Sequence, residues 1–251
     1  MSSKITGIIL AAGKGTRIKS NGANKVSYPF LGKPIILYGV ELFEKICDDI
    51  VVVVGAFSQS VKDIIDGKKK IKYAIQKQRL GTGHAVKIAL LEIKKDPPSL
   101  VLIGMGDHMM FYKQETIKKL ITQHNEQKSA VSFISTKYHD PNTLAWGRVE
   151  RDKSGNVLDI VEQKDASVKQ RKIKELNSAF YCFDYNFLRE NINKIKKSDV
   201  TREYYLPDLI KIALANKQKV HAMLVHFREI GIGINKKEEL EESQDLYKKI
   251  S

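Results

Sequence analysis

Short runs of apolar and β-branched residues recur along this chain, and each is followed by a stretch with helical periodicity. The clearest runs lie at residues 5–10, 50–54, 71–75, 100–103 and 130–135. The alternation predicts βαβ units, in which strands buried on both faces are joined by helical crossovers into a mostly parallel sheet flanked by helices. Ligands of such sheets bind beyond the carboxyl ends of the strands, so functional residues are expected where these runs end.

Later segments continue the α/β pattern. Residues 114–127 have an apolar helical face that includes His124, which we interpret as a half-buried helix residue rather than a ligand. Residues 147–151 and 157–161 flank a Ser-Gly-Asn turn and predict a hairpin. Helices are expected from about Asp184, Tyr204 and Lys237, and a last strand at 220–225. We find no linker or internal repeat, and we expect residues 1–251 to form a single domain.

Composition narrows the function classes. The 251 residues carry a formal charge of +14, but the lysine pairs are spread over predicted helices instead of alternating with aromatic residues, so we expect no nucleic-acid partner. No apolar run is long enough to span a bilayer, which predicts a protein without a membrane segment. The two cysteines form no CxxC pair and follow no signal peptide, which favours a cytoplasmic location.

The first predicted strand leads directly into LAAGKGTR, residues 10–17. Gly13 and Gly15 let backbone N–H groups approach an anion, and Lys14 and Arg17 add positive charge, so the loop is suited to phosphate. The spacing fits neither the P-loop nor the G-x-G-x-x-G fingerprint, because Ile18 stands at the last position of the latter. An ordinary glycine turn with two solvated cations is the alternative interpretation.

A carboxylate follows another predicted strand. Asp107 comes after residues 100–103 and a Gly-Met-Gly segment. A carboxylate facing a triphosphate is repelled by roughly 4 kcal/mol at 4 Å and an effective dielectric near 20, unless a cation lies between them. Together with the phosphate loop, Asp107 therefore implies Mg²⁺. The neighbouring His108 does not indicate zinc, because no Cys/His cluster or H-E-x-x-H sequence accompanies any of the histidines.

Several motifs occur in an order that resembles a known family. They are LAAGKGTR with Lys25 downstream, Gln76 followed by LGTGH, Gly106-Asp107, Trp146-Gly147-Arg148, IVEQKDA, Glu175-Leu176-Asn177, EYYLPD and Gly233-Ile234-Asn235. Over nearly the whole chain, this order resembles the sugar-phosphate nucleotidylyltransferases. The resemblance is closest to the uridylyltransferase (pyrophosphorylase) domain of bifunctional N-acetylglucosamine-1-phosphate uridylyltransferase. It implies a Rossmann-like nucleotidyltransferase fold in which the small β-hairpin region binds sugar.

The resemblance also implies a role for each matching residue. Nucleotide binding is expected at Leu10, Ala11, Ala12, Gly13, Gln76, Gly81 and Thr82. Lys14 and Arg17 are expected to hold the departing pyrophosphate, and Lys25 to contact the reacting phosphates. Asp107 and Asn235 are the implied Mg²⁺ ligands. Sugar recognition is expected at Gly147, Glu162 and Asn177, with Tyr204 and Thr201 as weaker candidates.

The implied reaction joins a nucleoside triphosphate and a sugar 1-phosphate and releases pyrophosphate, with UTP and N-acetylglucosamine 1-phosphate as the expected pair. Bifunctional relatives continue into a β-helix of hexapeptide repeats that carries acetyltransfer. This sequence contains no such repeats, so we expect a monofunctional enzyme, with its oligomeric state open. The loop at His108-Met109-Met110 and the Ser178-Ala179 pair depart from the usual family residues. A cytidylyl- or thymidylyltransferase acting on another sugar, polyol or choline phosphate therefore remains an alternative, as does a non-catalytic nucleotide-sugar or nucleic-acid binding module.

Overall fold

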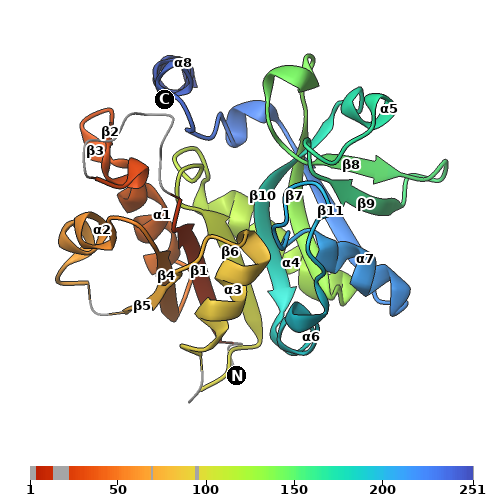
Figure 1. The fold of residues 1–251 in the computed structure, drawn as a ribbon, viewed down its shortest axis with the longest axis horizontal. Coiled ribbons are helices and arrows are strands. Elements are labelled where there is room, and N and C mark those ends of the chain that lie inside the picture. Colours follow the sequence, from red (N-terminus) through yellow and green to blue (C-terminus); the bar gives the residue numbers. More distant parts are fainter. Residues whose placement is uncertain (1–3, 14–22, 69, 94–95, 251) are drawn as a thin grey trace.

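A mixed β-sheet runs through the whole molecule (Figure 1). The computed structural model describes residues 4–13, 23–68, 70–93 and 96–250. The sheet order is β11-β7-β10-β6-β1-β4-β5. These strands are β1 Ile5–Ala11, β4 Asp49–Val54, β5 Ile71–Ile75, β6 Leu100–Met105, β7 Val131–Lys137, β10 Glu175–Asp184 and β11 Val220–Val225. All neighbouring pairs in this path are parallel except those of β10, which is antiparallel to both β6 and β7.

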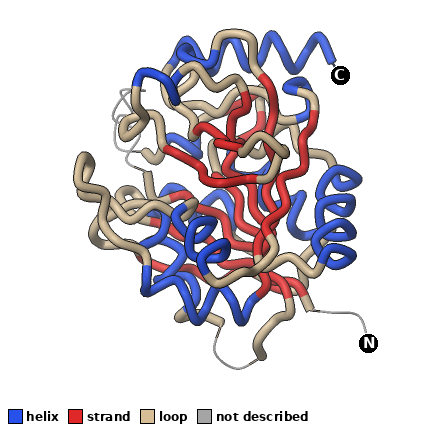
Figure 2. Tube along the Cα trace, turned by 90° about the vertical axis from the view of Figure 1, so that its right-hand side faces the viewer, coloured by secondary structure: helices blue, strands red, loops and turns tan. Residues whose placement is uncertain are grey.

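Helices cover both faces of the sheet, as the sequence predicts, and in Figure 2 the strands run between them. The α-helices are α1 Ile35–Glu44, α2 Ser58–Ile65, α3 Thr82–Leu90, α4 Gln114–Gln127, α5 Val168–Arg171, α6 Tyr185–Asn191, α7 Asp208–Ala215 and α8 Lys237–Ile250. Successive residues of β4 point to opposite faces: Val52 joins a core that includes α1, α2 and α4, whereas Val53 joins a core that includes α3, α6 and α7. Among the described residues, no helix combines the length and apolar character needed to cross a membrane.

The predicted hairpin is confirmed as β8 Arg148–Arg151 and β9 Val157–Val161, which projects from β10 beside α5 and α7 (Figure 1). A further two-stranded sheet joins β2 Pro29–Phe30 to β3 Lys33–Pro34. Short 3₁₀ segments complete the chain: η2 Lys25–Ser27, η3 Pro141–Thr143, η4 Ile192–Lys194 and η5 Phe227–Glu229. The expected helices near Asp184 and Lys237 are confirmed as α6 and α8.

The helix expected near Tyr204 begins later, at Asp208, and that prediction was wrong. Pro207 disfavours a helical conformation at Leu206, and the segment before it instead bonds through its backbone to the start of α3. The Tyr204 N–H donates to the Leu80 carbonyl at 2.8 Å, and the Tyr204 carbonyl accepts from the Gly83 N–H at 2.8 Å. His124 is also more buried than expected, at 2% exposure, with Nδ1 2.9 Å from the Ser132 hydroxyl.

The carboxyl ends of β1 and β6 lie side by side in the middle of the sheet. The two strands are parallel, with Leu10 opposite Met105, and the Gly106 N–H donates to the Leu10 carbonyl at 3.0 Å. The loops that follow these strands therefore start from one place, and the candidate site is built there.

Candidate active site

Two adjoining cavities open at this edge of the sheet. The first, of about 290 Å³, is lined by all of the predicted nucleotide residues, namely Leu10, Ala11, Ala12, Gly13, Gln76, Gly81 and Thr82. The second, of about 220 Å³, is lined by the predicted sugar residues Gly147, Glu162 and Asn177. Thr82, Met105 and Asp107 line both cavities. A ligand in the first cavity would therefore reach a ligand in the second beside Asp107.

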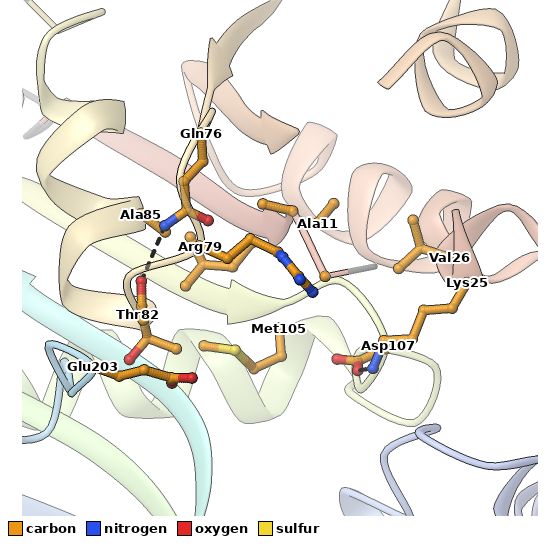
Figure 3. Close-up of a pocket in the computed structure, with 14 residues that line it drawn as sticks. Ala11, Lys25, Val26, Gln76, Arg79, Thr82, Ala85, Met105, Asp107 and Glu203 are labelled. Carbon is orange, nitrogen blue, oxygen red and sulfur yellow. Dashed lines mark hydrogen bonds and ion pairs between the residues drawn. The ribbon is translucent and has the colours of Figure 1, made fainter. Parts of the chain in front are cut away.

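Lys25 is placed at this junction by a buried asparagine. The Asn24 amide donates to the Ala11 carbonyl at 3.0 Å and to the Ala56 carbonyl at 3.2 Å, while its Oδ1 accepts from the Val26 N–H. These bonds tie the 3₁₀ turn η2 to the ends of β1 and β4. Lys25, the first residue of η2, then extends its side chain toward Asp107 (Figure 3).

Asp107 and Asn235 converge on the ammonium group of Lys25. Lys25 Nζ forms an ion pair with the Asp107 carboxylate and donates to Asn235 Oδ1 at 3.0 Å. The two acceptors are held together because the Ile234 N–H donates to the Asp107 carbonyl at 2.9 Å. Asn235 does not cap α8 with its side chain; instead the Glu239 carboxylate accepts from the Asn235 backbone N–H at 2.6 Å.

This donor set fits a hard divalent cation. A carboxylate and an amide oxygen are typical ligands of Mg²⁺, which completes its shell with water and substrate phosphates rather than with a full protein cage. Both oxygens already contact one positively charged group, so they point at a common cation position. Among the described residues, no group of three or more His, Cys, Asp or Glu side chains is arranged to hold a metal ion.

Gln76 lies at the end of the first cavity opposite Lys25, and Arg79 extends between them (Figure 3). Gly81 has a φ of +98°, and an added Cβ there would lie 2.4 Å from the Tyr204 carbonyl oxygen. Only glycine therefore allows the segment at Tyr204 to approach the start of α3 this closely. Thr82 is fixed as well, because its hydroxyl accepts from the Leu206 N–H at 2.9 Å.

The second cavity is shaped by a bulge in β10 next to the hairpin. The Asn177 N–H donates to the Gly147 carbonyl at 2.9 Å, and the Asn177 amide is held by the Tyr181 hydroxyl and the Ala179 N–H. Ala179 lines this cavity in the left-handed conformation, with a φ of +58°, which is rare for a residue with a side chain. Ala179, one of the residues that depart from the usual family sequence, therefore adds a methyl group to the cavity wall.

Buried aromatic and basic residues support the same wall. His108 is 5% exposed, lies 3.2 Å from the Gly231 carbonyl through Nε2, and packs against Trp146 with ring centroids 4.6 Å apart. Burial lowers the pKa of His108, so the ring is held neutral. The His108 and Ala179 substitutions that set this chain apart thus both lie on the second cavity.

Glu162 is half-buried at the rim of the second cavity. Burial raises its pKa to about 7, with help from the nearby Asp208 and Asp165 carboxylates and against the attraction of Arg148. The folded protein therefore retains a proton that the unfolded chain, with an ordinary glutamate pKa, loses. The contribution of this group to stability is full below about pH 4.5 and is lost as the pH rises through about 7.

Glu162→Gln is accordingly expected to be more stable than the native protein at pH 8, and close to it at pH 5. The stability advantage of the variant over the native protein should grow by on the order of 2 kcal/mol between pH 5 and pH 8. Urea unfolding at both pH values measures it, with Glu126→Gln on the exposed face of α4 as a control for removing one charge. If variant and native protein differ in unfolding free energy by the same amount at both pH values, the pKa of Glu162 is not raised.

The described residues predicted for the site all line the two cavities, whereas Lys14 and Arg17 lie outside the described residues. The two weaker sugar candidates do not line the second cavity. Thr201 hydrogen-bonds to the Tyr205 hydroxyl, and Tyr204 packs against His84. Sequence reasoning missed Arg79 and Glu203, which line the first cavity. Arg79 stands only two residues before Gly81, and this cation within the Gln76 to LGTGH segment was the available signal.

Comparison with known proteins agrees with this arrangement. The chain is 40% identical over 242 residues to the bifunctional protein GlmU of Caldicellulosiruptor saccharolyticus, an overlap covering 96% of this chain and 51% of that protein. It is 37% identical over 243 residues to the same protein of Clostridium botulinum strain Loch Maree, covering 96% and 52%. The chain therefore spans about half the length of these curated relatives.

A solved structure gives independent support for the fold. A putative glucose-1-phosphate thymidylyltransferase from Bacillus anthracis, crystallised with sucrose, superimposes with a TM-score of 0.78 and 17% identity. The match covers 98% of this chain and 96% of that one. The sequence profile of the nucleotidyl transferase family matches residues 6–229. The chain therefore belongs to the nucleotidyl transferase family, and it is an enzyme of that type.

Proposed function

We propose that residues 1–251 form one catalytic domain that transfers a uridylyl group from UTP to N-acetylglucosamine 1-phosphate and releases pyrophosphate with the help of Mg²⁺. The observation that carries the proposal is the junction of the two cavities at Thr82, Met105 and Asp107. A triphosphate bound along the first cavity and a sugar phosphate bound in the second would bring their reacting phosphates together beside Lys25 and Asp107.

The base of the nucleotide would be recognised in the first cavity and the sugar in the second. Gln76 would pair with the edge of a pyrimidine, and the close approach of Tyr204 to Gly81 would leave little room for a purine. Gly147, Glu162 and Asn177 would contact the sugar hydroxyl and acetamido groups. A side chain at Gly147 would meet Ile160 at 2.8 Å and lie 3.6 Å from Glu162, so the glycine keeps this wall open.

The reaction needs no protein nucleophile, because the sugar phosphate is itself an anionic nucleophile. Lys25 and Arg79 would stabilise the charge that builds up on the phosphates, and Lys14 and Arg17 would hold the departing pyrophosphate. Asp107 and Asn235 would hold Mg²⁺, which supplies charge neutralisation between the two polyanions when it is bound. The role of the protein is thus to align two substrates and to offset their repulsion.

The test is pyrophosphate release by the purified protein with Mg²⁺. UTP, dTTP, CTP and ATP would be crossed with N-acetylglucosamine 1-phosphate, glucose 1-phosphate and a polyol or choline phosphate. Turnover is expected to be at least tenfold faster with UTP and the N-acetylated sugar than with any other pair. Preference for another pair would contradict the proposed substrates and assign specificity to His108 and Ala179, and binding without turnover would contradict catalysis.

A further inference from the structure

The orientation of the Gln76 amide is fixed by two groups behind it. Gln76 is 5% exposed, and its Nε2 lies 3.1 Å from the Gly81 carbonyl and 3.1 Å from His84 Nδ1. A carbonyl oxygen can only accept, so the amide atom facing Gly81 must be the nitrogen. One hydrogen of Nε2 then binds the Gly81 carbonyl, and the other is directed at His84.

His84 is suited to receive that second hydrogen. The Gln76 amide nitrogen has no free lone pair, so in its 3.1 Å contact with His84 Nδ1 it can only donate. Burial is the largest influence and lowers the pKa of His84, as does Lys87, so the ring is neutral and carries a single proton. Because Nδ1 accepts from the Gln76 amide, that single proton lies on the other ring nitrogen, Nε2.

The surroundings hold this arrangement still. His84 lies in the first turn of α3, and its ring stacks on Tyr204 with centroids 6.5 Å apart and planes at 27°. Tyr204 is itself anchored through its backbone to Leu80 and Gly83. Both hydrogens of the Gln76 amide are therefore engaged away from the cavity, and the carbonyl oxygen is directed into it (Figure 3).

We propose that His84 is a positioning residue that sets base specificity by holding Gln76 as a hydrogen-bond acceptor toward the nucleotide. This inference rests on the proposed function, because it takes the first cavity as the nucleotide site. Uracil and thymine present a ring N–H to such an acceptor. Cytosine in the same pose presents a ring nitrogen with a lone pair, and the two acceptors repel.

The experiment compares UTP and CTP on the native protein, His84→Phe and His84→Asn. Equilibrium binding by calorimetry and kcat/KM are both measured with Mg²⁺ and N-acetylglucosamine 1-phosphate. Phenylalanine removes the acceptor, so the UTP-to-CTP preference should fall by about tenfold. Asparagine retains an acceptor near the position of Nδ1, and it should restore most of the preference even where both variants lose overall activity.

His221→Phe is the matched control, because His221 also pairs with a glutamine, Gln123, at 3.1 Å but lies on β11 away from the cavity. It should leave the preference unchanged. An unchanged preference in His84→Phe, or an equal loss in His84→Phe and His84→Asn, would overturn the positioning role. A binding preference for UTP that is lost in His84→Phe and kept in His84→Asn, without any turnover, would support the inference while contradicting the proposed function. Absence of nucleotide binding would contradict both.

Discussion

Lys25→Met is expected to lower kcat by about a thousandfold while changing the KM for UTP much less. Lys25 lies where the two cavities meet, with a side chain only 13% exposed, so its charge is little screened by solvent. Negative charge grows at this point as the phosphates react, and loss of one such donor typically costs two to three orders of magnitude in rate. Steady-state kinetics at saturating substrates measures the change.

The same substitution is expected to tighten the binding of Mn²⁺ by about tenfold in the absence of substrates, because two cations cannot share one position. Lys25 occupies the point on which Asp107 and Asn235 converge, and it must leave before a divalent ion can enter. Electron paramagnetic resonance titration measures the free Mn²⁺, with Lys87→Met on the exposed side of α3 as the control. Unchanged kcat would remove Lys25 from the reaction, and unchanged Mn²⁺ affinity would exclude the competition.

Arg148→Met is expected to lower the free energy of unfolding by about 3 kcal/mol. Arg148 is fully buried, and its guanidinium donates to the carbonyls of Pro141 at 2.7 Å, Leu144 at 3.3 Å and Trp146. Methionine would leave these carbonyls without their donors inside the protein. Because residues 141–147 lead into the second cavity, the KM for the sugar phosphate should also rise, by about tenfold.

Urea unfolding and separate KM measurements for the two substrates test this role. Arg189→Met removes a largely exposed arginine from α6 and should change stability by less than about 0.5 kcal/mol. Arg148→Lys retains a charge without the planar fork, so we expect an intermediate loss. A KM that rises equally for UTP and the sugar phosphate would show that Arg148 supports the whole site rather than the second cavity.

The parallel part of the sheet was predictable because its strands are continuous apolar runs, as in β4 and β6. The central strand β10 was not predicted. Its sequence carries Asn177 and Ser178 at buried positions, and a bulge with Ala179 at positive φ interrupts the alternation of a regular strand. A strand that contributes to a site can thus lose the pattern by which strands are found.

The site was predictable in its residues but not in its contacts. The order of motifs identified Asp107 and Asn235 through a family resemblance, whereas their convergence on Lys25 joins positions 210 residues apart. Local sequence carries no information on such a contact. The supporting role of Arg148 was equally hidden, because its guanidinium donates to backbone carbonyls, which every residue has and which no sequence pattern reveals.

In the proposed reaction, the uridylyl group passes directly from UTP in the first cavity to the sugar phosphate in the second. This transfer is tested by whether pyrophosphate release from UTP requires the sugar phosphate. The purified protein would be incubated with Mg²⁺ and UTP, with and without N-acetylglucosamine 1-phosphate, and both pyrophosphate and UDP-N-acetylglucosamine would be quantified. We expect release only when the acceptor is present, with equal amounts of the two products. Release at the same rate without the acceptor, or no release in either case, would contradict a direct displacement at Lys25 and Asp107.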